Sequence, residues 1–246
     1  MYQQKTYIYG NRIEIDKHYT WRCYNRNEGR QPKTKPTPEA MKKRNDREAI
    51  RKLSRLLIQN FTESDWHLVL TYRPENRPDQ EGAKKELNHF LRKLRREYKK
   101  HGEELRYIVV TEFESKNIHH HIVLNGISDM SEVINACWEG GKHFTPLYQD
   151  KDFGGLAEYL TKETRRTFDK SDAVFRKRYY CSKNLRQPVV KVKQVDADSW
   201  RKEPKVPARL VKLGYVLDKN SVEYGVNEMG YGYQRYILIR YQRRRP

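Results

Sequence analysis

The feature that most constrains the fold is the order in which extended and helical patterns alternate between residues 67 and 148. The first segment, His67–Tyr72, is an apolar run of strand length that ends just before Pro74. A long basic helix is expected next, because apolar residues recur at intervals of three and four: Leu87, Phe90, Leu91, Leu94 and Tyr98. The chain therefore opens a layered structure in which a helix covers a sheet.

Two more strands, a second helix and a fourth strand complete this pattern. Residues 107–113 and 118–125 are rich in Ile and Val and are joined by a short polar connection, as in a β-hairpin. A helix is expected over 131–137, and a strand over 143–148. The order β-α-β-β-α-β is that of the split βαβ fold, an α+β arrangement in which an antiparallel sheet carries helices on one face and leaves the other open.

The regions on either side of this pattern are expected to be basic extensions. A basic linker over 24–47 and a helix ending near Asn60 precede the sheet. A helix over 155–166 follows it, and the end of the chain is β-rich from Tyr215. The expected regions are a basic N-terminal extension with short strands and a helix over 1–60, a central domain over 61–168, and a basic, β-rich C-terminal region over 169–246.

The charge of the chain indicates a polyanionic partner. Lys and Arg total 51 against 32 Asp and Glu, which gives a formal net charge of +19. The cations are spread along the chain instead of forming one amphipathic anchor, so nucleic acid is favoured over a membrane surface. No stretch is long and apolar enough to span a membrane, and the three cysteines lack zinc-site spacing. We therefore expect free thiols and a cytoplasmic protein.

A histidine pair on the second hairpin strand is the first candidate for chemistry. Side chains alternate along a strand, so His119 and His121 share one face while His120 lies on the other. Two imidazoles at this spacing can bind one metal ion. Taken alone, such a pair is more often structural or surface-exposed, so the interpretation depends on its neighbours.

The first hairpin strand supplies a candidate third ligand, Glu112. Directly opposed residues of an antiparallel pair share a face, so Glu112 joins the histidines if paired residue numbers add to an odd value, as when Glu112 is opposite His119. Glu114 lies on the same face and is the alternative ligand. Two imidazoles and a carboxylate suit a divalent transition ion and tolerate magnesium.

The helix over 155–166 carries a candidate nucleophile. Tyr159 and Lys162 are three residues apart and therefore lie on the same side of the helix. A tyrosine with an ordinary pKa of about 10 is mostly protonated at neutral pH, so a nearby cation would help it to react as an oxyanion. The competing interpretation is that Tyr159 only packs the helix onto the core.

The order and spacing of these motifs resemble those of the HUH endonucleases, and of rolling-circle replication initiators in particular. The resemblance covers residues 66–166: a strand ending Leu70-Thr71-Tyr72, then a His-x-His motif at His119–His121, then a tyrosine followed three positions later by Lys162. Because the third motif contains one tyrosine, the chain resembles the single-tyrosine class. The residue between the two histidines, His120, replaces the hydrophobe usual in the family, which leaves a shifted histidine pair open.

The resemblance implies a DNA-nicking and strand-joining endonuclease that initiates rolling-circle replication. His119, His121 and Glu112 would bind Mg²⁺ or Mn²⁺ on the open face of the sheet. Tyr159 would attack a phosphate of single-stranded or hairpin origin DNA to give a 5′-phosphotyrosine, assisted by Lys162. The chain has no GxxxxGK[ST] phosphate loop, so unwinding is expected from a separate host helicase.

Basic side chains around these motifs are expected to bind the DNA backbone, and the competing interpretation of each is a solvated face. The candidates are Arg92, Arg96, Arg165, Arg166, Arg176 and Arg178. Two further functions stay open. A relaxase or single-strand DNA transposase of the same superfamily would share the chemistry, and a non-catalytic nucleic-acid-binding module would share only the sheet.

Overall fold

The chain forms two units, each built on its own sheet. The computed structural model describes residues 1–20, 39–114, 117–147, 153–164, 174–175, 177–227 and 230–241. Over these residues the chain is α+β, with two five-stranded antiparallel sheets and five α-helices. One unit combines residues 1–37 with 187–246, and the other spans 38–186. The boundaries expected near residues 60 and 168 differ from this division, because the helix that ends at Asn60 belongs to the second unit.

The second unit contains the split βαβ fold, and the predicted order of elements is confirmed. The elements are β3 (Trp66–Thr71), the 3₁₀ turn η1 (Pro74–Asn76), α2 (Gln80–Lys100), β4 (Tyr107–Glu114), β5 (Asn117–Leu124), α3 (Met130–Cys137) and β6 (Lys142–Pro146). The strands lie in the order β6-β3-β5-β4-β7, all antiparallel, with the short β7 (Tyr180–Cys181) at one edge. Within the four-stranded motif the two central strands are therefore the first and third, as this fold requires.

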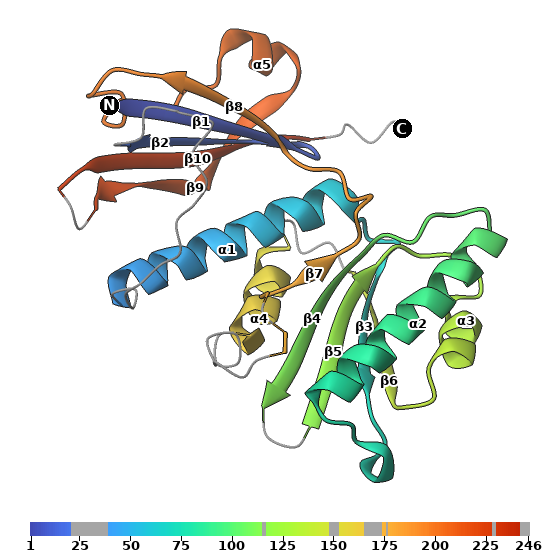
Figure 1. Ribbon diagram of the computed structural model, residues 1–246. Helices are drawn as coiled ribbons and strands as arrows, with labels where there is room; N and C mark the ends of the chain where they lie inside the picture. Colours follow the sequence, from blue (N-terminus) through green and yellow to red (C-terminus); the bar gives the residue numbers. More distant parts are fainter. Residues whose placement is uncertain are drawn as a thin grey trace, which may run out of the picture. The chain divides into compact units, whose positions relative to one another are not determined.

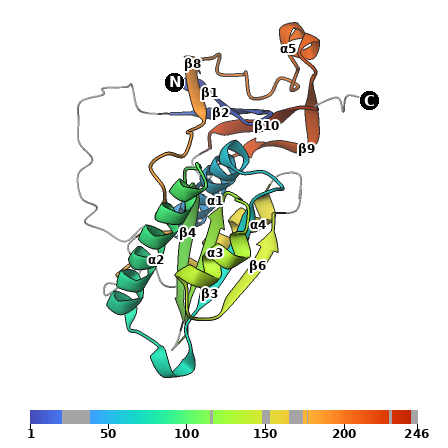
Figure 2. The same cartoon turned by 90° about the vertical axis from the view of Figure 1, so that its right-hand side faces the viewer.

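One face of this sheet packs on α2 and α3 (Figures 1 and 2). Alternate strand residues point toward these helices, because side chains change faces at every position. The core formed here includes Leu68, Leu70, Val109, Ile122 and Leu124 from the strands, with Leu87, Phe90, Leu94, Tyr98 and Ile134 from the helices. The apolar stripe predicted for residues 87–98 is thus the buried face of α2.

The other face, expected to be open, carries two helices over part of its area (Figure 2). These are α1 (Glu39–Asn60) and α4 (Gly154–Thr164), which also pack on each other. Leu53 and Leu57 of α1 and Leu160 of α4 contact the same core cluster as Val110 and Val123 of the sheet. The helices lie there because their apolar residues need a partner and the alternate strand residues supply one.

Two glycines fix the start of β6 against the end of β3. A Cβ atom on Gly140 would overlap the carbonyl oxygen of Thr71, and one on Gly141 would overlap the Thr71 hydroxyl. The amide of Thr71 donates to the carbonyl oxygen of Gly141 over 2.9 Å. The close approach of these two backbones therefore requires glycine at both positions.

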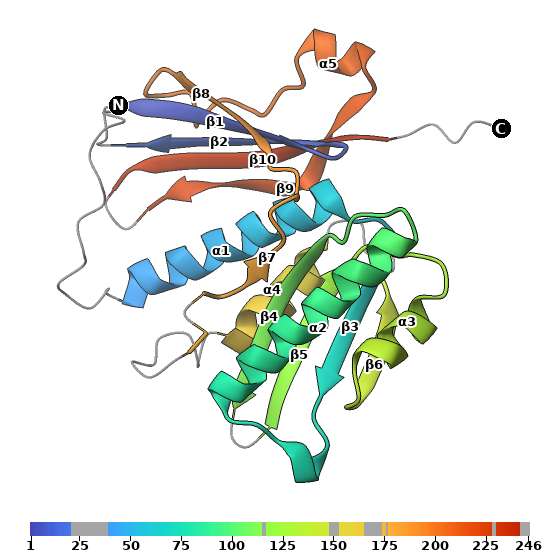
Figure 3. The same cartoon turned by 45° about the vertical axis from the view of Figure 1, so that its right-hand side comes forward.

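The first unit brings the two ends of the chain into one sheet (Figure 3). Its elements are β1 (Tyr2–Tyr9), β2 (Arg12–Tyr19), β8 (Val189–Gln194), α5 (Ala208–Lys212), β9 (Tyr215–Val226) and β10 (Gly232–Arg240), in the strand order β8-β1-β2-β10-β9. The β-rich C-terminal region is as predicted, but it forms one sheet with the N-terminal strands instead of a separate extension. A small core of Ile13, Ile15, Tyr236 and Leu238 lies under α5 and the segment before it.

None of the helices in the described residues is both long and apolar enough to cross a membrane. Cys137 and Cys181 are free thiols, the first buried and the second exposed, while Cys23 lies outside the described residues.

Candidate active site

The β4–β5 hairpin places the predicted ligands on one face of the sheet. Glu112 is paired with His119, and His121 is paired with Val110, so the odd-sum register expected from the sequence is confirmed. Opposed residues of an antiparallel pair share a face, and alternate residues of one strand share it too. Glu112, His119 and His121 therefore project toward the side of the sheet on which α1 and α4 lie.

Glu112 and His121 are close neighbours within this group. The Nε2 atom of His121 lies 3.5 Å from a carboxylate oxygen of Glu112, and the His121 side chain is only 3% exposed. His119 is half-buried. Among the described residues, no three His, Cys, Asp or Glu side chains are gathered closely enough to hold a metal ion in this conformation. The backbone thus aligns the three residues, and two of their side chains are in contact.

Helix α4 places Tyr159 beside this pair. The helix buries Ala157, Leu160 and Thr161, and the Thr161 hydroxyl donates to the Ala157 carbonyl over 2.7 Å. Tyr159 lies on the remaining side and is 44% exposed. Its ring meets that of His121 edge to face, with centroids 5.4 Å apart and an interplanar angle of 86°. Tyr159 is therefore not consumed by core packing, and its phenol ring lies at the candidate ligands.

Lys162 is exposed on the same helix, one turn after Tyr159. A cation at this distance along the helix can approach the phenol oxygen without burial of its charge. The arrangement thus joins an accessible tyrosine, a lysine, two histidines and a carboxylate from β4, β5 and α4 (Figure 1).

His67 is a residue of this site that the sequence analysis did not single out. It lies on β3, and its ring stacks on that of His121 with centroids 5.5 Å apart and planes 19° apart. It also contacts the edge of the Tyr159 ring, at 6.3 Å. Burial and the neighbouring His121 and His143 lower the pKa of His67 to about 4. Its Nε2 atom is buried and has no hydrogen-bond partner among the described residues.

The sequence contained only an indirect sign of His67. Its place on an apolar strand suggested a structural role, and its proximity to His121 depends on the pairing of β3 with β5. That pairing sets Val69 opposite His121, so His67, two residues earlier, lies on the same face. Strand order within the sheet was therefore the missing information.

His120 lies on the opposite face and is a satisfied core histidine. Its Nε2 atom is 2.8 Å from the Tyr72 hydroxyl, and its Nδ1 atom is 2.9 Å from the Thr111 hydroxyl. Burial and the flanking histidines lower the pKa of His120 to about 3. Both ring nitrogens are thus engaged in the core formed with α2 and α3. A histidine pair that includes His120 is therefore not arranged to share a ligand with His119 or His121.

The basic residues predicted to bind DNA have different surroundings. Arg92 and Arg96 are exposed on α2, which covers the face of the sheet opposite to His121 and Tyr159 (Figure 1). Arg178 forms an ion pair with Asp46 of α1, and both side chains are largely buried, so this pair and not solvent surrounds its guanidinium. Three predicted contacts lie outside the described residues: Arg165, Arg166 and Arg176.

Comparison with known proteins adds one finding to this geometry. Searches among curated proteins and among solved structures gave no match. Residues 65–164 match the family of the Replication-associated protein ORF2. The matched segment begins just before β3 and ends with α4, so it contains every element of the candidate site. This part of the chain is thus similar to replication-associated proteins, which supports a role in replication initiation.

Proposed function

We propose that the unit spanning residues 38–186 is a metal-dependent, single-tyrosine endonuclease of the HUH type that nicks and rejoins single-stranded DNA at a replication origin. The observation that carries the proposal is the contact of Tyr159 with His121, whose Nε2 atom is 3.5 Å from Glu112. These residues come from three separate elements, α4, β5 and β4. A phenol held at an imidazole–carboxylate pair is unnecessary for packing, since Ala157 and Leu160 already bury the helix.

The donor set suits a divalent cation. Two imidazoles and one carboxylate fit Mn²⁺ and tolerate Mg²⁺, and they leave positions for phosphate oxygens. Glu112 and His121 already lie together, whereas His119, on the same face, would join them through a side-chain rotation. A bound Mg²⁺ or Mn²⁺ would polarise the scissile phosphate and offset negative charge in the transition state.

Tyr159 would supply the attacking oxygen. Its exposed phenol can reach a phosphate that lies over Glu112 and His121, and Lys162 would stabilise the phenolate. The bond from the phenol oxygen to phosphorus forms as the bond to the 3′ oxygen breaks, and the leaving strand ends as a 3′ hydroxyl after taking up a proton. The 5′ end stays on the enzyme as a phosphotyrosine.

The covalent intermediate explains why one site can both cut and join. The phosphotyrosine conserves the free energy of the phosphodiester, so a later 3′ hydroxyl can displace Tyr159 without ATP. Relaxases and single-strand transposases use the same chemistry. The similarity of residues 65–164 to replication-associated proteins favours origin nicking, with a separate host helicase to unwind the duplex.

The proposal is tested by covalent adduct formation. The protein is incubated with 5′- or 3′-labelled single-stranded DNA carrying candidate origin hairpins, with Mg²⁺ or Mn²⁺, and the products are separated under denaturing conditions. We expect a protein–DNA adduct that EDTA and Tyr159→Phe abolish.

Tyr179→Phe is the matched control, because Tyr179 packs against the same core cluster as α4 and burial raises its pKa to about 12. This variant is expected to form the adduct. An adduct that persists in Tyr159→Phe refutes the assigned nucleophile. Binding without an adduct on every origin substrate would instead indicate a non-catalytic nucleic-acid-binding module.

A further inference from the structure

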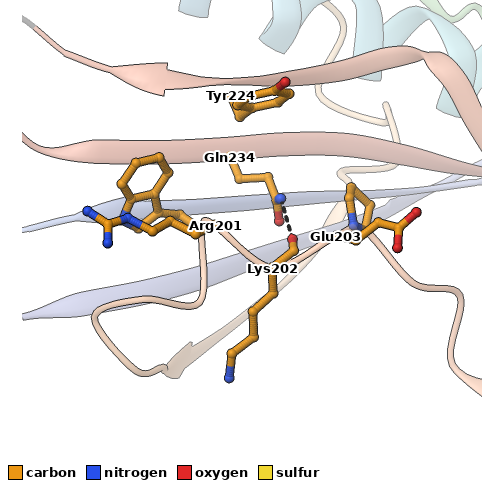
Figure 4. A pocket seen from close by; sticks show the side chains of 7 residues that line it. Arg201, Lys202, Glu203, Tyr224 and Gln234 are labelled. Atoms are coloured by element: carbon orange, nitrogen blue, oxygen red, sulfur yellow. Dashed lines mark hydrogen bonds between the residues drawn. The ribbon is translucent and has the colours of Figure 1, made fainter.

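A pocket of about 380 Å³ opens on one face of the first unit's sheet (Figure 4). It is lined by a short segment after β8 and by the two C-terminal strands: Trp200, Arg201, Lys202, Glu203, Pro204, Tyr224 and Gln234. This volume lies at the lower end of the range for small-molecule sites, roughly 300–1,000 Å³. The pocket therefore has room for a group the size of one nucleoside.

The walls of this pocket are held in place by specific contacts. The Gln234 side-chain amide, on β10, donates to the Lys202 carbonyl over 2.7 Å, which ties the segment to the sheet (Figure 4). Trp200 packs directly on Gly232, where a Cβ atom would overlap the indole ring. The Arg201 guanidinium lies over the same indole, 5.0 Å from the ring centroid. The segment is thus anchored at both Trp200 and Lys202.

Tyr224 forms the exposed aromatic wall. It lies on β9, directly opposite Gln234, and is 71% exposed. Figure 4 shows its ring on the same side of the sheet as Gln234 and the segment carrying Lys202. Such exposure of a tyrosine ring at the mouth of a pocket leaves one π-face available to a planar partner.

A buried positive charge lies behind the floor of the pocket. Lys17 of β2 is opposite Gln234, and its Nζ atom donates to the Gln234 side-chain oxygen and to the Ser199 carbonyl, each over 2.8 Å. Both acceptors are neutral. Burial and the charges of Lys202 and Lys193 lower the pKa of Lys17, which shows that cations dominate its surroundings. An anionic ligand would therefore be stabilised at this place.

We propose that this pocket binds one nucleotide of single-stranded DNA, with the base stacked on Tyr224 and the backbone phosphate held by Arg201 and Lys202. An exposed aromatic ring beside cationic side chains is the arrangement that binds unpaired bases without reading their sequence. The first unit would then hold the strand while the second unit cuts it. The choice of DNA as the ligand rests on the proposed function; the pocket and its charge do not.

Binding of a fluorescein-labelled 15-nucleotide single strand, followed by anisotropy in EDTA so that no cleavage occurs, tests this site in the full chain. Tyr224→Ala should weaken binding by about tenfold, the effect of losing one base–aromatic stack, and Tyr224→Phe should bind as the wild type does. Tyr241→Ala is the matched control, because Tyr241 is 68% exposed at the end of the same unit and outside the pocket. Lys202→Ala should lower the salt dependence by roughly one phosphate contact.

Wild-type affinity in Tyr224→Ala would overturn the proposal, and so would an equal loss of affinity for a duplex of the same length, because a duplex offers no unpaired base. Adduct formation separates this proposal from the nuclease. At saturating DNA, Tyr224→Ala should still form the adduct, and a failure there would contradict a role confined to binding. If the wild type forms no adduct but Tyr224→Ala still loses affinity, the nuclease assignment fails and the pocket stands.

Discussion

Replacing Thr111 by valine removes one of the two hydrogen bonds that hold the buried ring of His120. Valine has the shape of threonine, and Thr111 is 4% exposed, so the change leaves the packing intact and strands the His120 Nδ1 atom, now 2.9 Å from its partner. A buried polar group left without a partner costs roughly 1–3 kcal/mol. For a chain of this length each kcal/mol lowers the Tm by roughly 2–4 °C. We therefore expect Thr111→Val to lose about 2 kcal/mol and about 6 °C.

Urea unfolding and thermal denaturation measure this loss directly. Thr145→Val is the matched control, because Thr145 is half-buried on β6 and its hydroxyl makes no hydrogen bond among the described residues. This control should change stability by less than about 0.5 kcal/mol. In a His120→Leu background the Thr111 change should lose its effect, since the bond is already absent. Equal stabilities of Thr111→Val and Thr145→Val would refute the view of His120 as a hydrogen-bonded core residue.

Three other outcomes are expected. Glu112→Gln keeps the shape of the side chain but removes its charge, so Mn²⁺ affinity measured by calorimetry should fall at least about tenfold, whereas a fall in Glu114→Gln instead would move the ligand. His67→Ala should slow adduct formation by roughly tenfold or more, because the rings of His121 and Tyr159 lose a neighbour; His67→Phe should keep the rate, and an equally slow Phe variant would show that the ring nitrogen matters. Burial raises the pKa of Asp16, but the hydrogen bond from His18 and the charge of Arg235 outweigh it and lower that pKa to about 2. The folded carboxyl thus binds a proton less readily than the unfolded one, so this stabilisation is complete above about pH 4 and disappears as the pH falls through about 2; urea midpoints across this range should decline less in Asp16→Asn than in the wild type.

The sequence predicts the second unit well because its signals are local. Helical and strand periodicities differ in each segment from residue 67 to 146, and the short connection after Glu114 fixes the hairpin register. That register alone aligns Glu112 with His119. The single-residue alternation along β5 likewise separates His120 from the two histidines beside it.

The features that were missed depend on contacts between distant parts of the chain. His67 enters the site only through the pairing of β3 with β5, and no local pattern encodes that neighbour. The same holds for the first unit, where β2 pairs with β10 across more than two hundred residues of sequence. The coverage of the second sheet face by α1 and α4 was missed for a related reason, since an amphipathic helix indicates that it packs but not on which face.

The most direct measurement is the identity of the residue that carries DNA after the reaction. The adduct is trimmed with nuclease and digested with trypsin, and the peptide of residues 152–162, which contains Tyr159 as its one tyrosine, is analysed by mass spectrometry. The account predicts that this peptide gains the mass of a 5′-linked nucleotide, located on Tyr159 by fragmentation. A nucleotide found on any other residue of the chain would contradict it.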